Sequence, residues 1–280
     1  MYPNRTQKTE IQMFKQIILI ISMGIFGNLF GQKKHTENFE SYIRISNNLK
    51  QFIVVDTGLN SIAPVNSKQN LLKISFQMLN IDDEGLCASE EELAEFGEIE
   101  DKMVEKLTKD EIFVGRITSN GLRDFYFYTK DKKTELVFQD ILKKHEKFKT
   151  KITFEVAENW NKYYKLLYPT NEEFQKIGNR SVLDNLEEGG DKLTLEREVF
   201  HWIYFKTEKD QENFIKEVKK LNFSVVSKSK IKDEFPYQLQ IKRVDKVDEE
   251  SVNEYVIQLW KLAPKHNGNY DGWETSIEKE

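Results

Sequence analysis

Residues 196–226 read EREVFHWIYFKTEKDQENFIKEVKKLNFSVV and contain two apolar runs on either side of a helical pattern. Residues 196–205 are rich in β-branched and aromatic side chains, the composition of a strand. Thr207 is a typical helix N-cap, and apolar residues then recur at helical spacing from Phe214 to Leu221. Residues 223–226 predict a second, short strand. The stretch therefore predicts a β-α-β unit.

Strand-like and helix-like patterns continue to alternate toward the C-terminus. Residues 236–243 alternate apolar and polar side chains, residues 248–263 carry an apolar helical stripe, and residues 270–277 predict a last strand. The order becomes β-α-β-β-α-β. This is the split β-α-β order of a ferredoxin-like unit, with an antiparallel sheet and both helices on one face.

The first half of the chain repeats that order. Strands are predicted at 70–80, 111–117, 122–129 and 151–157, and helices at 89–107, behind a Ser89–Glu92 capping box, and at 136–148. Asn120-Gly121 is typical of a tight hairpin. Residues 39–56 predict an added edge strand or hairpin, and a helix near 171–187 precedes the second unit. The predicted fold is α+β, with two tandem ferredoxin-like units in domains 36–168 and 170–280.

Residues 17–30 form an apolar stretch flanked by basic residues. The stretch is too short to span a bilayer, which needs about 20 residues. It fits the central part of a signal peptide over residues 1–31, with Met1 or Met13 as initiator and cleavage after Gly31. We therefore expect a periplasmic or secreted protein without stable membrane insertion after cleavage. The alternatives are an uncleaved anchor, or a buried N-terminal helix in a cytoplasmic protein.

Composition narrows the function classes. The 280 residues are 39% hydrophobic and 32% charged, which excludes collagen-like, polytopic membrane and wholly disordered chains. A net charge of −5 lacks the basic surplus of sequence-independent nucleic-acid binding, so nucleic acid is not the expected partner. Cys87 is the only cysteine and the histidines are scattered, so we expect no disulfide, metal or other cofactor. No catalytic constellation stands out, and we expect no enzyme activity.

Two aromatic segments remain as candidate binding sites. Residues 199–205 carry bulky side chains on both faces of one predicted strand, although helices are expected on one face only. The extra aromatics either pack against another domain or a second copy, or they form an exposed partner site. In residues 270–275, the simpler interpretation makes Gly272 a bulge or a close-packing glycine and Trp273 a core anchor. The candidate partner-binding residues are Phe200, Trp202, Tyr204, Asp271, Gly272, Trp273 and Glu274.

These segments also carry a family resemblance. Four stretches resemble the regulator of ribonuclease E activity B family: Gly190-Asp191, Arg197–Phe205, Phe235-Pro236-Tyr237 and Asn269–Thr275. The resemblance covers roughly residues 170–280. It implies a ferredoxin-like domain and a non-catalytic inhibitor that binds a protein surface on an RNA-degrading enzyme.

A second resemblance lies upstream. Three stretches resemble domain-of-unknown-function family 695: Gly115–Thr118, Gly121–Tyr128 and Trp160–Tyr164. That family occurs fused ahead of such a regulator domain. The leading hypothesis is a protein-binding or regulatory module, reused on another partner if the chain is exported. The alternatives are single-stranded RNA binding on the aromatic strand, or an envelope enzyme of unknown reaction.

Overall fold

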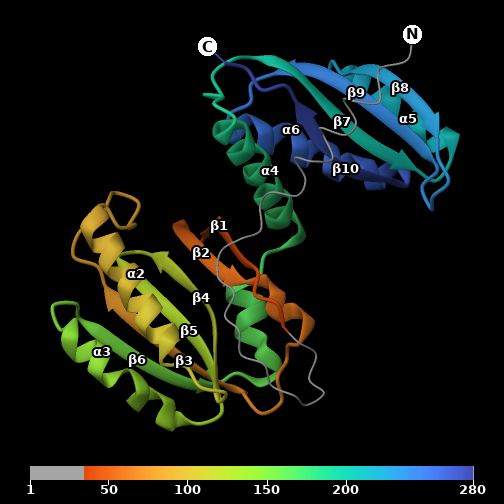
Figure 1. Ribbon diagram of the computed structural model, residues 1–280. Coiled ribbons are helices and arrows are strands. Elements are labelled where there is room, and N and C mark those ends of the chain that lie inside the picture. The colour runs from red at the N-terminus through yellow and green to blue at the C-terminus, as the bar shows by residue number, and fades with distance from the viewer. Residues whose placement is uncertain (1–34, 280) are drawn as a thin grey trace. The chain divides into compact units, whose positions relative to one another are not determined.

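The structure is a computed structural model that describes residues 35–279 (Figure 1). The predicted signal peptide, residues 1–31, lies outside the described residues. The predicted α+β class is confirmed, with one antiparallel sheet of six strands and one of four. No helix in the described part of the chain is long and apolar enough to cross a membrane.

Of the two alternatives for residues 39–56, an edge strand or a hairpin, the N-terminal sheet contains the hairpin. Its strands are β1 (Phe39–Ser46), β2 (Leu49–Asp56), β3 (Asn70–Gln77), β4 (Glu111–Ser119), β5 (Leu122–Thr129) and β6 (Thr150–Val156). They pair in the order β1-β2-β4-β5-β3-β6, and every neighbouring pair is antiparallel. Asn120 and Gly121 have φ values of 50° and 75° and form the tight turn between β4 and β5. The pair β1-β2 widens the sheet beyond β4.

One face of this sheet carries helices α2 (Glu90–Glu105) and α3 (Gln139–Lys144), the latter preceded by the 3₁₀ helix η2 (Lys132–Phe138). The Phe96 ring of α2 packs against Phe76 and Phe148 in a core rich in buried phenylalanines. Ser89 caps α2 by accepting from the Glu92 N–H. The predicted capping box is only half formed, because the Glu92 carboxylate accepts from the N–H groups of Leu79 and Asn80 instead. Glu92 thereby joins the helix start to the end of β3.

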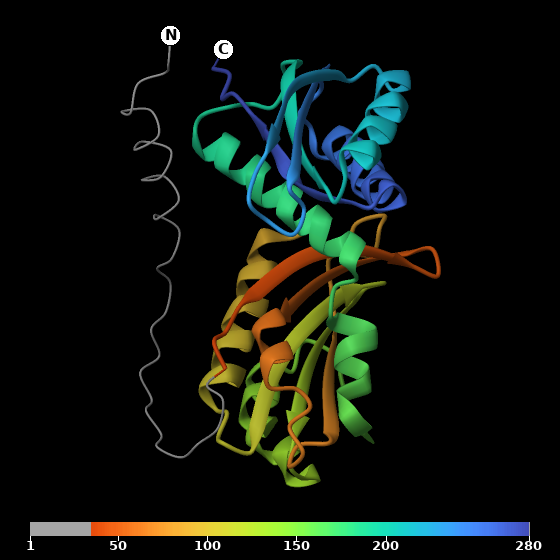
Figure 2. The same cartoon turned by 90° about the vertical axis from the view of Figure 1, so that its right-hand side faces the viewer.

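The opposite face of the same sheet is also covered. Two short helices that the sequence did not predict, η3 (Glu158–Trp160) and η4 (Tyr163–Leu167), lie on it, on the side away from α2 (Figure 2). Trp160 and Tyr163 are fully buried there beside Tyr128. The cover is needed because the strands place apolar residues on both faces. Residues 57–69 are mostly loop, with the short η1 (Thr57–Ser61) at their start.

The C-terminal sheet pairs in the order β10-β7-β9-β8, again antiparallel throughout. Its strands are β7 (Arg197–Phe205), β8 (Ser224–Lys230), β9 (Tyr237–Asp245) and β10 (Gly268–Thr275). Helices α4 (Asn171–Glu188), α5 (Glu208–Lys220) and α6 (Glu249–Leu262) contribute to one core with these strands, and the short η5 (Ala263–His266) leads into β10. The strand β8 extends four residues past the predicted end at 226, because its exposed edge position needs no apolar side chains.

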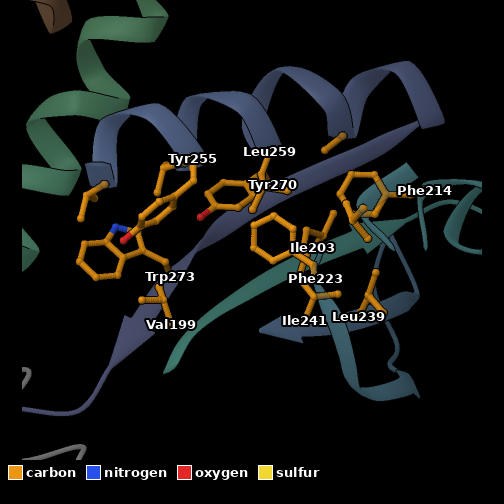
Figure 3. Packing of buried hydrophobic residues seen from close by; sticks show 14 of the residues in the cluster. Val199, Ile203, Phe214, Phe223, Leu239, Ile241, Tyr255, Leu259, Tyr270 and Trp273 are labelled. Carbon is orange, nitrogen blue, oxygen red and sulfur yellow. The ribbon is translucent and has the colours of Figure 1, made fainter. Parts of the chain in front are cut away.

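Figure 3 shows how this core is assembled. Tyr255 and Leu259 of α6 point toward the sheet and pack in one core with Tyr270 of β10 and Ile203 of β7. Every second residue of β7 is buried in the core, and the residues between them are not. The helices therefore seal one face of the sheet only.

Candidate partner-binding face

The face of the C-terminal sheet that points away from α5 and α6 carries the aromatic residues noted in the sequence. We call it the open face and define it by residues of three neighbouring strands. They are Phe200, Trp202 and Tyr204 of β7, Gln238, Gln240 and Lys242 of β9, and Gly272 and Glu274 of β10. The three aromatic side chains are half-buried, whereas Glu274 is exposed. The open face thus presents aromatic surface to solvent.

Hydrogen bonds between strands hold the aromatic side chains in place. The Gln238 amide donates to the Tyr204 hydroxyl at 2.8 Å and accepts from the Ser229 hydroxyl at 2.6 Å. The Trp202 indole N–H donates to a Glu274 carboxylate oxygen at 3.2 Å, and the Gln240 amide donates to the same oxygen at 3.3 Å. Ordered side chains lose less entropy on association, so this arrangement suits a binding surface.

The Phe200 end of the open face is charged. The Lys242 ammonium lies 5.7 Å from the centre of the Phe200 ring and 2.5 Å from a Glu198 carboxylate oxygen. The lysine charge is therefore compensated within the face. Glu274 pairs with Phe200 across the strands on its other side, so the face carries no surplus of positive charge.

A β-bulge in β10 explains the Tyr-Asp-Gly-Trp segment. The register shifts between Tyr270 and Gly272, so Asp271 is an extra residue and stays exposed. Residues three apart in a regular strand point to opposite faces, but the bulge turns both Tyr270 and Trp273 into the core. Gly272 is therefore a bulge glycine, as the simpler interpretation held.

Gly272 also shapes the open face. Its φ of 155° is one that side chains rarely adopt, and a Cβ at this position would contact nothing within 4 Å. Gly272 pairs with Trp202 across the strands. No atom of the described residues therefore lies close above Gly272, next to the strand position of Trp202.

Trp273 requires a correction to the set of partner-binding candidates. Its side chain lies on the helix side, is 9% exposed, and donates its indole N–H to the Asn179 side-chain oxygen of α4 at 2.9 Å. It is a core anchor, as the simpler interpretation held, because the bulge places it on the same face as Tyr270. Phe200, Trp202, Tyr204, Gly272 and Glu274 do come together on the open face, with Asp271 at its edge.

His201 lies directly behind the aromatic row, on the core side of β7. One ring nitrogen lies 2.8 Å from the Tyr270 hydroxyl, and the ring packs edge-on against Phe223 and Tyr255. Burial, reinforced by the nearby positive charge of Arg243, lowers the His201 pKa to about 3. His201 is neutral at physiological pH and holds the strand in place, out of reach of any solute.

Sequence reasoning missed the Ser229 contact with the open face, because β8 extends beyond its predicted end. The register of β8 also shifts between Val225 and Ser227, so alternation continued past residue 226 would have placed Lys228, and not Ser229, beside Gln238. Within residues 35–279, no group of three His, Cys, Asp or Glu side chains is placed to hold a metal ion.

The C-terminal part of the chain is an α+β domain with one four-stranded antiparallel sheet, and it follows a larger domain built on the six-stranded sheet. Residues 176–275 match the family described as Regulator of ribonuclease activity B, and residues 37–168 match the Family of unknown function DUF695. The chain therefore carries a regulator domain of the first family and a DUF695 domain, and both resemblances noted in the sequence are confirmed. No curated protein matches the chain.

Proposed function

We propose that this chain is a non-catalytic regulator whose C-terminal domain is a ferredoxin-like module that binds a protein partner through the open face. One observation carries the proposal: three aromatic side chains, each part-exposed and held by neighbouring side chains, form a row on the face of the sheet that α5 and α6 leave free. Aromatic residues are enriched at protein interfaces because they bury large areas at low entropic cost. The family match to a ribonuclease regulator supports a protein as the target.

Charge distinguishes a protein partner from single-stranded RNA. Stacked bases would need nearby cations for the phosphates, as RNA-binding sheets provide. On the open face Lys242 is paired with Glu198, and Glu274 adds a carboxylate beside Trp202. A phosphate backbone would be repelled there. A protein surface with amide or cationic groups could instead satisfy Glu274.

Alanine substitution at both Trp202 and Tyr204 tests the open face. A photo-crosslinking residue at Gln240, beside the aromatic row, should trap a discrete partner in cells, and mass spectrometry identifies it. We expect the Trp202→Ala/Tyr204→Ala variant to bind the purified partner at least about tenfold more weakly, since interface aromatics often contribute 2 kcal/mol or more. An endoribonuclease of the ribonuclease E type is the first partner to assay, by inhibition of RNA cleavage.

The matched control is Leu136→Ala/Val156→Ala, which removes two exposed apolar side chains from the N-terminal domain. It should bind like the unchanged chain. Equal binding by the Trp202→Ala/Tyr204→Ala variant would refute the open face as the contact. Binding of mixed-sequence RNA that disappears in the same variant would favour the RNA alternative. A crosslink only to a second copy of the chain would favour a homodimer.

We also propose that residues 1–31 are a signal peptide and that the protein works in the periplasm or outside the cell. The apolar stretch 17–30 between basic residues supports this. N-terminal sequencing of the protein from an envelope fraction should find Gln32 first. An intact Met1 or Met13 in the cytosol would contradict export and would favour control of a cytoplasmic ribonuclease.

A further inference from the structure

The six-stranded sheet is wider than its two helices. Neighbouring strands lie about 4.8 Å apart and packed helices about 8–10 Å apart, so two helices cover roughly four strands. Glu100 of α2 pairs with Arg116 of β4, which places α2 over that strand. The strands β1 and β2 continue the sheet beyond β4 (Figure 1). Among residues 35–279, no helix therefore lies above the helix-side face of these two strands.

A cleft of about 650 Å³ occupies this position, between the C-terminal half of α2 and the strands β1, β2 and β4. We call it the α2 cleft. Its apolar lining includes Phe39 and Phe113, whose rings stack with centroids 5.9 Å apart, and Val54, Val104 and Leu107. Phe39 and Val104 are each 43% exposed. The volume lies within the range of small-molecule sites, about 300–1,000 Å³.

The charges around the α2 cleft are strongly unbalanced. Six carboxylates line it, against one arginine and one histidine. Three of the six are already engaged: Glu100 pairs with Arg116 at 2.5 Å, Asp56 with His35 at 2.6 Å, and Glu111 accepts from Thr108 and Thr134. The other three have no ion-pair partner among the described residues.

These three acids are Glu37, Asp101 and Glu105, and all are exposed at the rim. Asp101 and Glu105 are one helical turn apart on α2, so they present two like charges on one side of the apolar lining. A cleft lined by one sign of charge concentrates the opposite ions. The cleft should therefore favour a cation over a neutral or anionic ligand of the same shape.

We propose that the α2 cleft binds a small amphiphilic amine, with its apolar body against Phe39 and Phe113 and its ammonium group toward Asp101 and Glu105. Apolar contact alone would accept an alcohol or a fatty acid of equal length. The rim carboxylates select the amine. This site lies in the DUF695 domain and is independent of the open face.

Three ligands of equal chain length test the proposal: octylamine, octanol and octanoate, titrated into the full-length chain by isothermal calorimetry. We expect octylamine to bind at least about tenfold more tightly than octanoate, because one ion pair near a surface contributes of the order of a tenfold change. The preference should shrink at high salt. No binding of octylamine, or equal binding of octylamine and octanoate, would overturn the proposal.

Substitutions then locate the site. Asp101→Asn/Glu105→Gln should reduce the preference for octylamine over octanoate about tenfold and leave octanol binding unchanged. Phe39→Ala should weaken all three ligands. The control, Glu98→Gln/Glu146→Gln, makes the same charge change at exposed sites that do not line the cleft.

Circular dichroism and thermal unfolding test whether each variant is folded. We expect the acid substitutions to leave the fold intact, because the changed side chains are exposed. A preference that survives in Asp101→Asn/Glu105→Gln, or one that falls as much in the control, would show that the ligand binds elsewhere. Either result refutes the site.

Discussion

Replacing Asp191 with alanine is expected to lower the free energy of unfolding by about 3–5 kcal/mol, because it leaves the buried Arg197 guanidinium without its counter-charge. The two side chains are 2% and 4% exposed, and their nearest charged atoms lie 2.7 Å apart. The carboxylate also accepts from the N–H groups of Leu193 at 2.8 Å and Glu278 at 2.9 Å. It thus ties the start of β7 to the segment after β10. Urea denaturation followed by circular dichroism measures the loss.

An exposed ion pair provides the control. Lys228 and Glu212 lie 2.6 Å apart with both side chains nearly half exposed. Glu212→Ala should therefore lose less than about 1 kcal/mol. The double variant Asp191→Leu/Arg197→Met should lose less than Asp191→Ala, since it leaves no buried charge. A loss under about 1 kcal/mol in Asp191→Ala would contradict this role.

The same pair has a pH signature. Burial acts to raise the pKa of Asp191, but the hydrogen bonds from Glu278 and Leu193 and the charge of Arg197 outweigh it, and the pKa lies below its ordinary value. A carboxyl with a depressed folded-state pKa stabilises the fold above its unfolded pKa of about 3.9. That contribution disappears as the pH falls through the lower, folded value. Below about pH 4 the unchanged chain should therefore approach the stability of Asp191→Ala.

Trp160→Ala is expected to have a comparable effect on the N-terminal domain, a loss of about 3–5 kcal/mol. The indole is fully buried, its ring stacks on Tyr128 with centroids 4.2 Å apart, and its N–H donates to the Lys68 carbonyl at 2.7 Å. Removing it opens a cavity under η3 and leaves that carbonyl without its donor. Thermal and urea unfolding of the full-length chain measure the loss.

Two substitutions calibrate the Trp160 result. Trp160→Phe keeps an aromatic ring on Tyr128 and loses only the hydrogen bond and part of the volume, so it should be the milder change. Trp202→Ala removes the same side chain from the half-exposed open face and should cost less than either. If Trp202→Ala proved as destabilising as Trp160→Ala, the open face would be a core surface and the proposed partner site would lose its basis.

Local patterns were sufficient to predict the order of the strands and of the longer helices, but not the short helices η3 and η4. The alternation in residues 70–77, the Asn120-Gly121 turn and the Thr207 cap each depend on neighbours in the chain, and the structure contains all three. The Ser89–Glu92 box was half wrong for the opposite reason. The Glu92 carboxylate accepts from the N–H groups of Leu79 and Asn80 and not from the local partner of a capping box. Only the folded chain brings those two N–H groups within its reach.

The candidate site divides in the same way. Period-two alternation placed Phe200, Trp202 and Tyr204 on one face of β7. For Trp273 it left a core role and a partner-binding role open, because the bulge at Asp271, which changes the face of every later residue, depends on how β10 pairs with β7. The extended end of β8 escaped prediction because an exposed edge strand needs no apolar signal.

The amino-acid sequence therefore determined the elements, the two families and the presence of an aromatic excess, all of which are properties of neighbouring residues. Tertiary structure alone decided which faces are covered. The second face of the six-stranded sheet is closed by Trp160 and Tyr163, whereas the open face of the C-terminal sheet and the α2 cleft are not. Whether a face is covered depends on which remote segments reach it and on how many strands two helices can span. The local periodicity of the sequence predicts neither of these.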